Sequence, residues 1–363
     1  MNVRKDSQAL SARFYFASSG GEIQEGREKA DETIPPSAAE PGKGFFLSFF
    51  VPRRGFWVTP LLLDLNFLVF LAMCLSGVGI FFPDNVDLLH WGADFAPLTL
   101  TGDYWRVLTC NYVHVGLIHL AMNMYALLFI GLFLEPLAGS RRMAMAYVLS
   151  GLYASLASLS VNAEWIAAGA SGAIFGLYGL FFAYLLLRRG GEERRKTLLV
   201  SIAVFILYNL LFGMRDDSVD NAAHVGGLGC GFLLGVAYGM SDKVREKSKR
   251  MVVACLAEFV LLSEFICWFS ALTHGMPPDY QDVREVWRSG LLEDYIRNGD
   301  SEIHSEENGM GQNTEYTVVE GWTMTDQDVW IPFSYEASGS VSVIRPIGIE
   351  SRMDGRISAS KTG

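Results

Sequence analysis

The sequence predicts an all-α, multi-pass membrane protein with polar segments at both ends. Half of the 363 residues are hydrophobic and only 19% are charged, whereas an ordinary soluble domain carries roughly 25% charged residues. The apolar residues are concentrated in the middle of the chain, in runs of about 18 or more, which is the length that crosses a bilayer as a helix. We therefore expect a bundle of transmembrane helices.

Seven apolar stretches are long enough to span a membrane. They are residues 59–82, 118–138, 143–161, 168–187, 197–214, 222–239 and 251–273. Before them, residues 1–43 are polar and rich in Ser, Glu, Gly and Pro, which predicts a disordered tail. Residues 44–58 combine aromatic side chains with two arginines and are typical of a segment at a membrane interface.

The C-terminal part of the chain, residues 274–363, is acidic and polar. It contains stretches of strand-like composition separated by Gly, Asp and Ser. Two interpretations stay open: a small β-rich appendage, or a loose acidic tail.

Lysines and arginines in the short loops predict the orientation. They precede the first span, and they follow the second, fourth and sixth spans. The alternate loops are nearly free of lysine and arginine, with Arg106 and Arg215 as the exceptions. The positive-inside rule then places residues 1–43 in the cytoplasm and residues 274–363 outside, with the protein in the cell membrane.

Composition also argues against several classes of function. The net charge is −10, and no basic patch is interleaved with aromatic residues as in nucleic-acid binding. The five cysteines lie in or beside apolar segments without CxxC spacing, so we expect small buried residues rather than disulfides or metal ligands. The N-terminus lacks the apolar core of a signal peptide.

Two polar residues stand out because such side chains are costly within a span. Ser171 lies at the start of the fourth span and His224 at the start of the sixth, so both have similar predicted depth near the outer face. Glycines recur at three- or four-residue intervals in the fourth span and at four-residue intervals in the sixth, which favours close packing of the two helices. Taken singly, Ser171 is more typical of a packing residue and His224 of a structural or transport-path histidine.

The start of the second span adds further polar side chains at the same predicted depth. His119 and Asn123 are four residues apart and share one helix face, and His114 precedes them near the surface. Taken alone, such residues are typical of hydrogen bonds between helices, but an imidazole and an amide are also suitable donors to an oxyanion.

These motifs together resemble the rhomboid family of intramembrane serine proteases. The resemblance rests on the YWR motif that contains Trp105 and Arg106, the HVGLIHLAMN segment from His114 to Asn123, GASG around Ser171, and AHVGGLGCG around His224, in this order along the chain. It covers about residues 59–240 and implies a six-helix catalytic core, to which residues 251–273 add a seventh transmembrane helix.

The resemblance implies a Ser–His dyad without an aspartate. Ser171 would be the nucleophile and His224 the general base, while Asn123, His119 and the backbone N–H of Ser171 would hold the oxyanion. The residues that would support the site are His114, Gly169, Gly172, Phe175, Gly227 and Gly231.

Within this supporting set, Gly172 would leave room for substrate, and Phe175 would stack on the catalytic imidazole. Trp105 and Arg106 would anchor the long loop before the second span in the membrane interface.

The reaction implied is hydrolysis of a peptide bond, through an acyl-enzyme, in the transmembrane segment of a single-pass protein near the outer membrane face. It implies no metal and no cofactor. Two rivals stay open: a non-catalytic relative that escorts membrane proteins, and a transporter with His114, His119 and His224 on a proton path. The first rival typically lacks the serine or histidine, and the second predicts internal repeats that this sequence does not display.

Overall fold

The computed structural model describes residues 50–188, 192–215 and 219–290, together with the backbone of four strands between residues 302 and 346. The predicted disordered tail, residues 1–43, and the beginning of the predicted interfacial segment lie outside the described residues.

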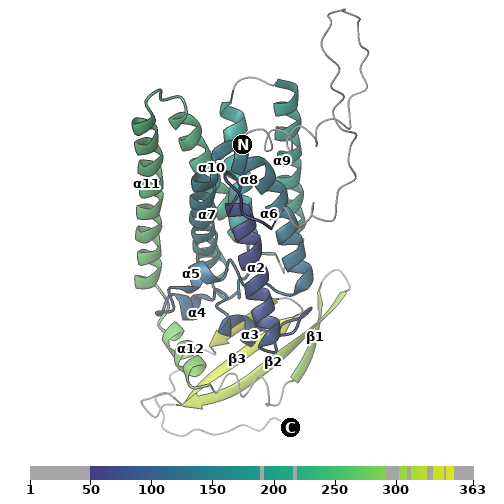
Figure 1. Cartoon of the computed structure of the whole chain (residues 1–363). Helices are drawn as coiled ribbons and strands as arrows, with labels where there is room; N and C mark the ends of the chain where they lie inside the picture. Colours follow the sequence, from purple (N-terminus) through teal and green to yellow (C-terminus); the bar gives the residue numbers. More distant parts are fainter. Residues whose placement is uncertain are drawn as a thin grey trace, which may run out of the picture. The chain divides into compact units, whose positions relative to one another are not determined.

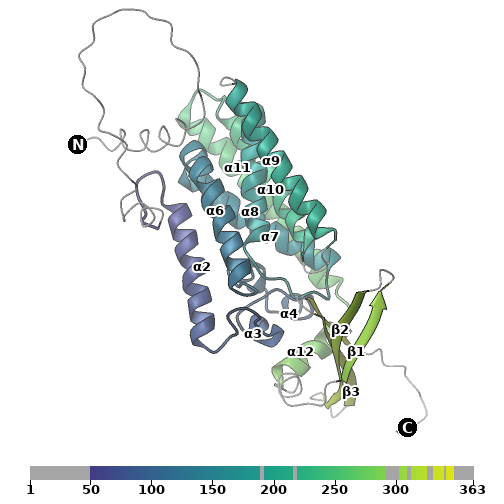
Figure 2. The ribbon, with the colours of Figure 1, turned by 90° about the vertical axis from the view of Figure 1, so that its right-hand side faces the viewer.

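The prediction of a multi-pass helical membrane protein is confirmed by seven apolar helices in the described part of the chain. They are α2 (Val58–Leu75), α6 (Leu117–Ala138), α7 (Ser140–Val161), α8 (Ser171–Leu187), α9 (Glu192–Gly213), α10 (Asn221–Ser241) and α11 (Lys247–His274). Figures 1 and 2 show these helices side by side in one bundle. Six are long and apolar enough to cross a membrane, and the shorter α8 has 17 residues.

The observed helix boundaries differ from the predicted ones most at the end of the first span and at the start of the fifth, and α8 in the fourth span begins three residues later than predicted. α2 ends at Leu75, because Gly77 adopts a φ of 100° and turns the chain there. α8 begins at Ser171, after Gly169 with a φ of 132°. At 1.5 Å per residue, α8 is about 25 Å long, shorter than the roughly 30 Å hydrocarbon core of a bilayer.

The connection between α2 and α6, residues 76–116, is folded rather than extended. It contains the short helices α3 (Asn85–His90), α4 (Ala96–Thr99) and α5 (Arg106–Thr109). These lie at one end of the bundle together with α12 (Asp279–Arg288), which follows α11 (Figure 1). We call this the site end, because Ser171 lies there.

Beyond α12 the backbone forms four antiparallel strands in the order β1-β2-β3-β4. They are β1 (Glu302–Asn308), β2 (Gln312–Met324), β3 (Trp330–Ser338) and β4 (Val341–Pro346), with Glu302 opposite Val318 and Tyr316 opposite Ser338. These strands lie within residues 274–363, the segment for which the sequence allowed two interpretations, a β-rich appendage or a loose tail.

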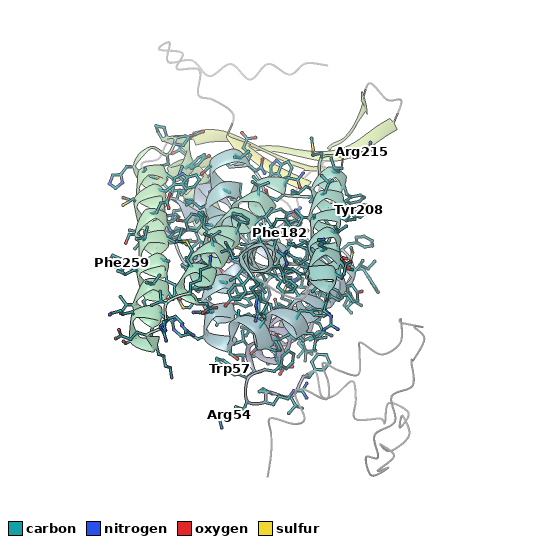
Figure 3. All side chains as sticks on the ribbon, turned by 90° about the horizontal axis from the view of Figure 1, so that it is seen from above. Arg54, Trp57, Phe182, Tyr208, Arg215 and Phe259 are labelled. Carbon is teal, nitrogen blue, oxygen red and sulfur yellow. The ribbon has the colours of Figure 1, made fainter. Side chains whose placement is uncertain are left out.

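α8 occupies the centre of the bundle and packs against α6, α7, α9 and α10. Ten consecutive residues, from Gly172 to Phe181, are buried, as expected for a helix that is apolar on every side. Figure 3 looks down on this arrangement: Tyr208 of α9 and Phe259 of α11 stand on opposite flanks of the bundle.

At the end of the bundle away from Ser171, Glu135 of α6 fixes the start of α2. Its carboxylate accepts hydrogen bonds from the backbone N–H groups of Trp57, Val58 and Thr59 at 2.7–2.8 Å, and from the Ser140 hydroxyl at 2.6 Å. These donors include N–H groups that a helix start leaves without an intrahelical partner. The buried carboxylate therefore joins α2, α6 and α7.

The seventh helix, α11, is held to the bundle by a buried glutamate. Glu258 accepts hydrogen bonds from Arg141 at 2.6 Å and from the Tyr238 hydroxyl at 2.8 Å. Because the Arg141 side chain is half exposed, solvent screens much of the ion pair. The hydroxyl bond from Tyr238, which is itself buried, therefore contributes the more dependable link to α10.

Candidate active site

The structure brings Ser171 and His224 together from the first turns of two neighbouring helices. Ser171 is the first residue of α8, and its Oγ lies 2.9 Å from Nε2 of His224 on α10. His224 is buried, with 8% of its surface exposed, whereas Ser171 is half-buried. As a first-turn residue, Ser171 also has a backbone N–H with no partner within the helix.

Glycines allow this contact because they let the α8 and α10 backbones touch. A Cβ on Gly227 would overlap the carbonyl oxygen of Gly172, and a Cβ on Gly231 would overlap that of Gly176. The Cβ position of Gly172 is directed at Ala154 of α7, so this glycine permits contact between helices. The short side chains of Ser171 and His224 could not meet across a wider interface.

An aromatic ring fixes the plane of the His224 imidazole. Phe175, one helical turn after Ser171, stacks on it with ring centroids 4.2 Å apart and an interplanar angle of 9°. Both rings are buried. The stacking leaves the imidazole edge, with Nε2, directed at the Ser171 hydroxyl.

Asp220 caps the helix that carries His224, a role that was not predicted from the sequence. Its Oδ1 accepts hydrogen bonds from the Ala223 N–H at 3.0 Å and from the amide of Asn162, the residue that follows α7, at 2.9 Å. The sequence does contain the signal, because Asp immediately before a helix is a favoured N-cap. Among the described residues, Oδ2 of Asp220 and Nδ1 of His224 are buried without a hydrogen-bond partner.

His119 and Asn123 lie on one face of α6. The His119 ring packs against Gly169, where a Cβ would come within 2.6 Å of the ring. Asn123 is buried and donates one amide hydrogen to the His119 carbonyl at 3.0 Å. A second amide hydrogen remains on the same nitrogen.

His114 lies behind His119, outside the helix. Its ring centroid is 5.4 Å from that of His119, and its Nδ1 lies 3.2 Å from the Tyr112 carbonyl oxygen. Burial lowers the pKa of His114 to about 3, so the ring is neutral at physiological pH. Because the His114 imidazole is neutral, it places no positive charge next to the His119 ring.

The segment that leads into Ser171 is paired with the α2–α6 loop. Ala167 and Asp94 exchange two backbone hydrogen bonds of 2.8 Å, and the Gly169 N–H donates to the Cys110 carbonyl at 2.9 Å. The two loops therefore form a short, strand-like contact directly before α8. Neither Asp94 nor Cys110 belongs to a motif that the sequence displays.

The Asp94 carboxyl is buried beneath this contact. It accepts hydrogen bonds from the Thr99 hydroxyl at 2.5 Å and from the Ser155 hydroxyl of α7. Burial raises the pKa of Asp94 to about 6, although the two hydroxyl groups oppose the shift. No motif spacing marks this residue, because its partners come from distant parts of the chain.

Trp105 and Arg106 lie in the α2–α6 loop, and the Arg106 guanidinium lies over the Trp105 ring, 4.7 Å from its centroid. Trp105 is 50% exposed, so its ring is free to meet a lipid interface. Arg106 turns inward and donates to the carbonyl oxygens of Leu89 at 2.7 Å and Ala93 at 2.9 Å. Its guanidinium thus ties the loop together instead of reaching for headgroups.

This arrangement has the parts required for nucleophilic catalysis. A hydroxyl lies within hydrogen-bond distance of an imidazole, which can remove its proton and later return it to a leaving group. The backbone N–H of Ser171 has no partner within the helix, and the His119 ring of α6 packs against Gly169, two residues before Ser171. Within the described residues, no group of three or more His, Cys, Asp or Glu side chains could hold a metal ion.

Comparison with known proteins identifies a family match over this part of the chain. A family model described as the Rhomboid domain matches residues 101–241. RHOMBOID-like protein 5 of Arabidopsis thaliana is 34% identical over 211 residues, which is 52% of this chain and 68% of that protein.

Two relatives carry protease in their names. Rhomboid protease GluP of Bacillus subtilis is 31% identical over 236 residues, covering 65% of this chain and 45% of that protein. Rhomboid-like protease 1 of Toxoplasma gondii is 31% identical over 161 residues, covering 43% of this chain and 55% of that protein. The chain thus spans less than half the length of GluP, and 39% of the length of RHOMBOID-like protein 4 of Arabidopsis thaliana.

Proposed function

The chain belongs to the rhomboid family, and we propose that it is an intramembrane serine protease that acts through a Ser171–His224 dyad. The observation that carries the proposal is the 2.9 Å separation of Ser171 Oγ and His224 Nε2. The names of the protease relatives support the same reaction class.

In the proposed mechanism, His224 takes the proton of the Ser171 hydroxyl as the oxygen attacks the scissile carbonyl. His224 then gives that proton to the departing amine, which leaves an acyl-enzyme at Ser171. Water next attacks the ester while His224 again acts as base, and this step frees the new carboxyl end. Phe175 holds the imidazole plane throughout, which preserves the direction of Nε2.

The oxyanion has three proposed donors. They are the backbone N–H of Ser171, the second amide hydrogen of Asn123, and the His119 ring beside Gly169. Preorganised donors of this kind act strongly because they need no rearrangement as charge develops. His114 supports His119 from behind and does not touch the reacting atoms.

The proposed substrate is the transmembrane segment of a single-pass protein with helix-weakening residues near its outer end. A regular helix keeps its carbonyl groups in hydrogen bonds, so the scissile region has to unwind before attack. We propose entry along α9, because α9 is the most loosely packed transmembrane helix: Val204, Leu207 and Tyr208 are each about 60% exposed or more.

The loop charges support an orientation in the cell membrane with residues 1–43 cytoplasmic and the site end outside. In this orientation, Ser171 and His224 lie near the outer face, where water for hydrolysis is at hand. Residues 274–363 would then also lie outside, whether as a β-rich appendage or as a tail.

The proposal is tested by reconstituting the full chain with a reporter that carries a single transmembrane segment. The unmodified protein should cleave the reporter, and S171A should lower the rate at least about a thousandfold, as loss of a catalytic serine does elsewhere. A fluorophosphonate should label the unmodified protein at Ser171 and should not label H224A. Cleavage that survives in S171A would eliminate the dyad.

The same experiment separates the rival functions. A non-catalytic escort would bind the reporter without cleaving it, and a proton-coupled transporter would move protons in the S171A variant as in the unmodified protein. N123A should retain part of the activity, because two oxyanion donors remain.

A further inference from the structure

The outer face of the α2–α6 loop is covered by α12, the helix that follows the seventh transmembrane helix. Val283 and Val286 of α12 are buried, and α12 packs against α4. The ring of Trp287 lies against His90 of α3, with centroids 4.7 Å apart. A ten-residue helix that follows α11 is therefore packed onto the loop that borders the site.

Arg284 is the charged residue at the centre of this contact. Its side chain is 9% exposed, and its Nη2 donates to Asp103 Oδ1 at 2.9 Å. The guanidinium lies over Gly102, where a Cβ would overlap it and where the φ of 140° favours glycine. The turn at Gly102 is thus shaped to receive this arginine.

The contact continues from Asp103 toward the site. The other oxygen of Asp103, Oδ2, accepts a hydrogen bond from Arg106 Nε at 3.2 Å. Arg106 in turn donates to the carbonyl oxygens of Leu89 and Ala93. One carboxylate therefore joins the arginine of α12 to the arginine that ties the loop together.

The last step leads from Ala93 to the catalytic serine. Asp94, the next residue, exchanges two backbone hydrogen bonds with Ala167, and Gly169 donates to Cys110. Ser171 follows Gly169 by two residues. Arg284 and Ser171 are thus connected through an unbroken series of hydrogen bonds and adjacent residues.

We infer that Arg284 is a positioning residue: it braces the α2–α6 loop through Asp103 and Arg106, and the braced loop holds the segment that presents Ser171. Both charges of the Arg284–Asp103 pair are largely shielded from water, with side chains 9% and 22% exposed. Removing Arg284 leaves Arg106 as the cation that pairs with Asp103. Because the site is largely shielded from water, solvent cannot fully replace the lost interaction. The part of this inference that concerns activity rests on the proposed function.

The experiment compares R284M with R288M in the full chain, reconstituted in lipid nanodiscs. Arg288 is on the same helix but exposed, so R288M removes an equal charge without touching the loop. Hydrogen exchange of the peptide that contains the Ala167 and Gly169 amides measures how firmly the segment is held, since both amides donate across the contact. A fluorophosphonate measures the reactivity of Ser171.

In R284M, exchange at this peptide should be about tenfold faster, as expected when a local contact opens more often. The labelling rate of Ser171 should fall about three- to tenfold, while the thermal midpoint and exchange in α8 and α10 stay near those of the unmodified protein. R288M should change neither rate. R284K should recover part of both, because lysine restores the charge but not the planar guanidinium.

Unchanged exchange at Ala167 and Gly169 in R284M would overturn the brace, as would an equal change in R288M. If R284M does not fold, D103N provides the same test from the other partner and should also speed exchange at this peptide. If the unmodified protein neither cleaves nor labels, the proposed function fails, and the exchange comparison still decides whether Arg284 holds the segment.

Discussion

The two sides of α8 differ in how they are packed. Toward α10, backbone meets backbone at Gly227 and Gly231, with no side chain in between. Toward α9, contact is made by large rings: Phe205 stacks on Tyr178 with centroids 4.3 Å apart and lies 6.3 Å from Phe175. On the α10 side the helix backbones are in direct contact, which makes this side rigid, whereas on the α9 side aromatic side chains separate the backbones.

This difference in packing fits the proposal that substrate enters along α9 while the site stays fixed on the α10 side. Backbone contact between glycines leaves no rotamers to adjust, so the Ser171–His224 distance is set by the helices themselves. Ring contacts such as those on α9 can slide and re-form, and most of α9 faces outward. We therefore expect substitutions on the α10 side to affect chemistry and those on the α9 side to affect access.

The largest expected effect comes from G231V. A valine there would collide with the Gly176 carbonyl of α8 and force the two helices apart. We expect labelling of Ser171 by a fluorophosphonate to fall below detection, together with a loss of stability of at least about 1–3 kcal/mol, the usual range for overpacking.

The matched control is G229V on the same helix. A Cβ at Gly229 meets nothing within 4 Å, so this variant should label and melt like the unmodified protein. Equal loss of labelling in both variants would mean that α10 tolerates no valine anywhere, and the rigid side would no longer be explained by the glycine contact.

The second prediction concerns the buried Asp94 carboxyl on the α7 side. Its pKa is about 6 in the folded protein, above its ordinary value of 3.8, so the folded state binds this proton more tightly than the unfolded state. The stabilisation from this proton is complete below pH about 4 and is lost as the pH rises through 6, a change of about 3 kcal/mol.

The asparagine of D94N cannot titrate at this position. Between pH 4 and 7, the unfolding free energy of the unmodified protein should therefore fall by about 3 kcal/mol relative to that of D94N. Denaturant unfolding in detergent at several pH values measures it. A difference that is constant with pH would contradict the assigned shift.

A smaller effect is expected from F175L, which removes the ring that stacks on His224. Aromatic pairs contribute about 0.5–1.5 kcal/mol beyond their buried area, so the labelling rate of Ser171 should fall up to about tenfold. F175Y keeps the ring and should label near the normal rate. If F175L also labels normally, the imidazole plane is held by the α10 backbone alone.

The smallest effect on chemistry is expected from F205A on α9. Labelling of Ser171 should stay within about twofold, because the rigid side is untouched, whereas the KM for a transmembrane reporter should change. V204A, at a side chain that is 60% exposed on the same helix, is the control and should change neither value. A large drop in labelling for F205A would show that α9 also shapes the site.

The sequence predicted the membrane helices well, because long apolar runs leave few alternatives to a spanning helix. The start of α8 was misplaced by three residues, since the turn at Gly169 depends on the His119 ring that fills the adjacent space. The predicted roles of Ser171 and His224 stay predictions, but their proximity follows from glycine spacing that is visible in the sequence.

The residues that the sequence could not identify share one property: their partners are far away in the chain. Asp94 meets Ser155 across 61 positions, and Arg284 meets Asp103 across 181. No local pattern marks such pairs, because an arginine in a polar helix or an aspartate in a loop is usually solvated. Only folding shows that these charges are buried.

The shortness of α8 has a consequence for which bonds the protein can reach. In the proposed orientation, α8 ends at the basic cytoplasmic boundary, so its length of about 25 Å stops Ser171 about one helical turn short of the other boundary of a roughly 30 Å bilayer core. The length of α8 thus sets the depth of Ser171 within the bilayer. A substrate would be selected by how far below the surface its first unwound peptide bond lies, before any side chain is compared.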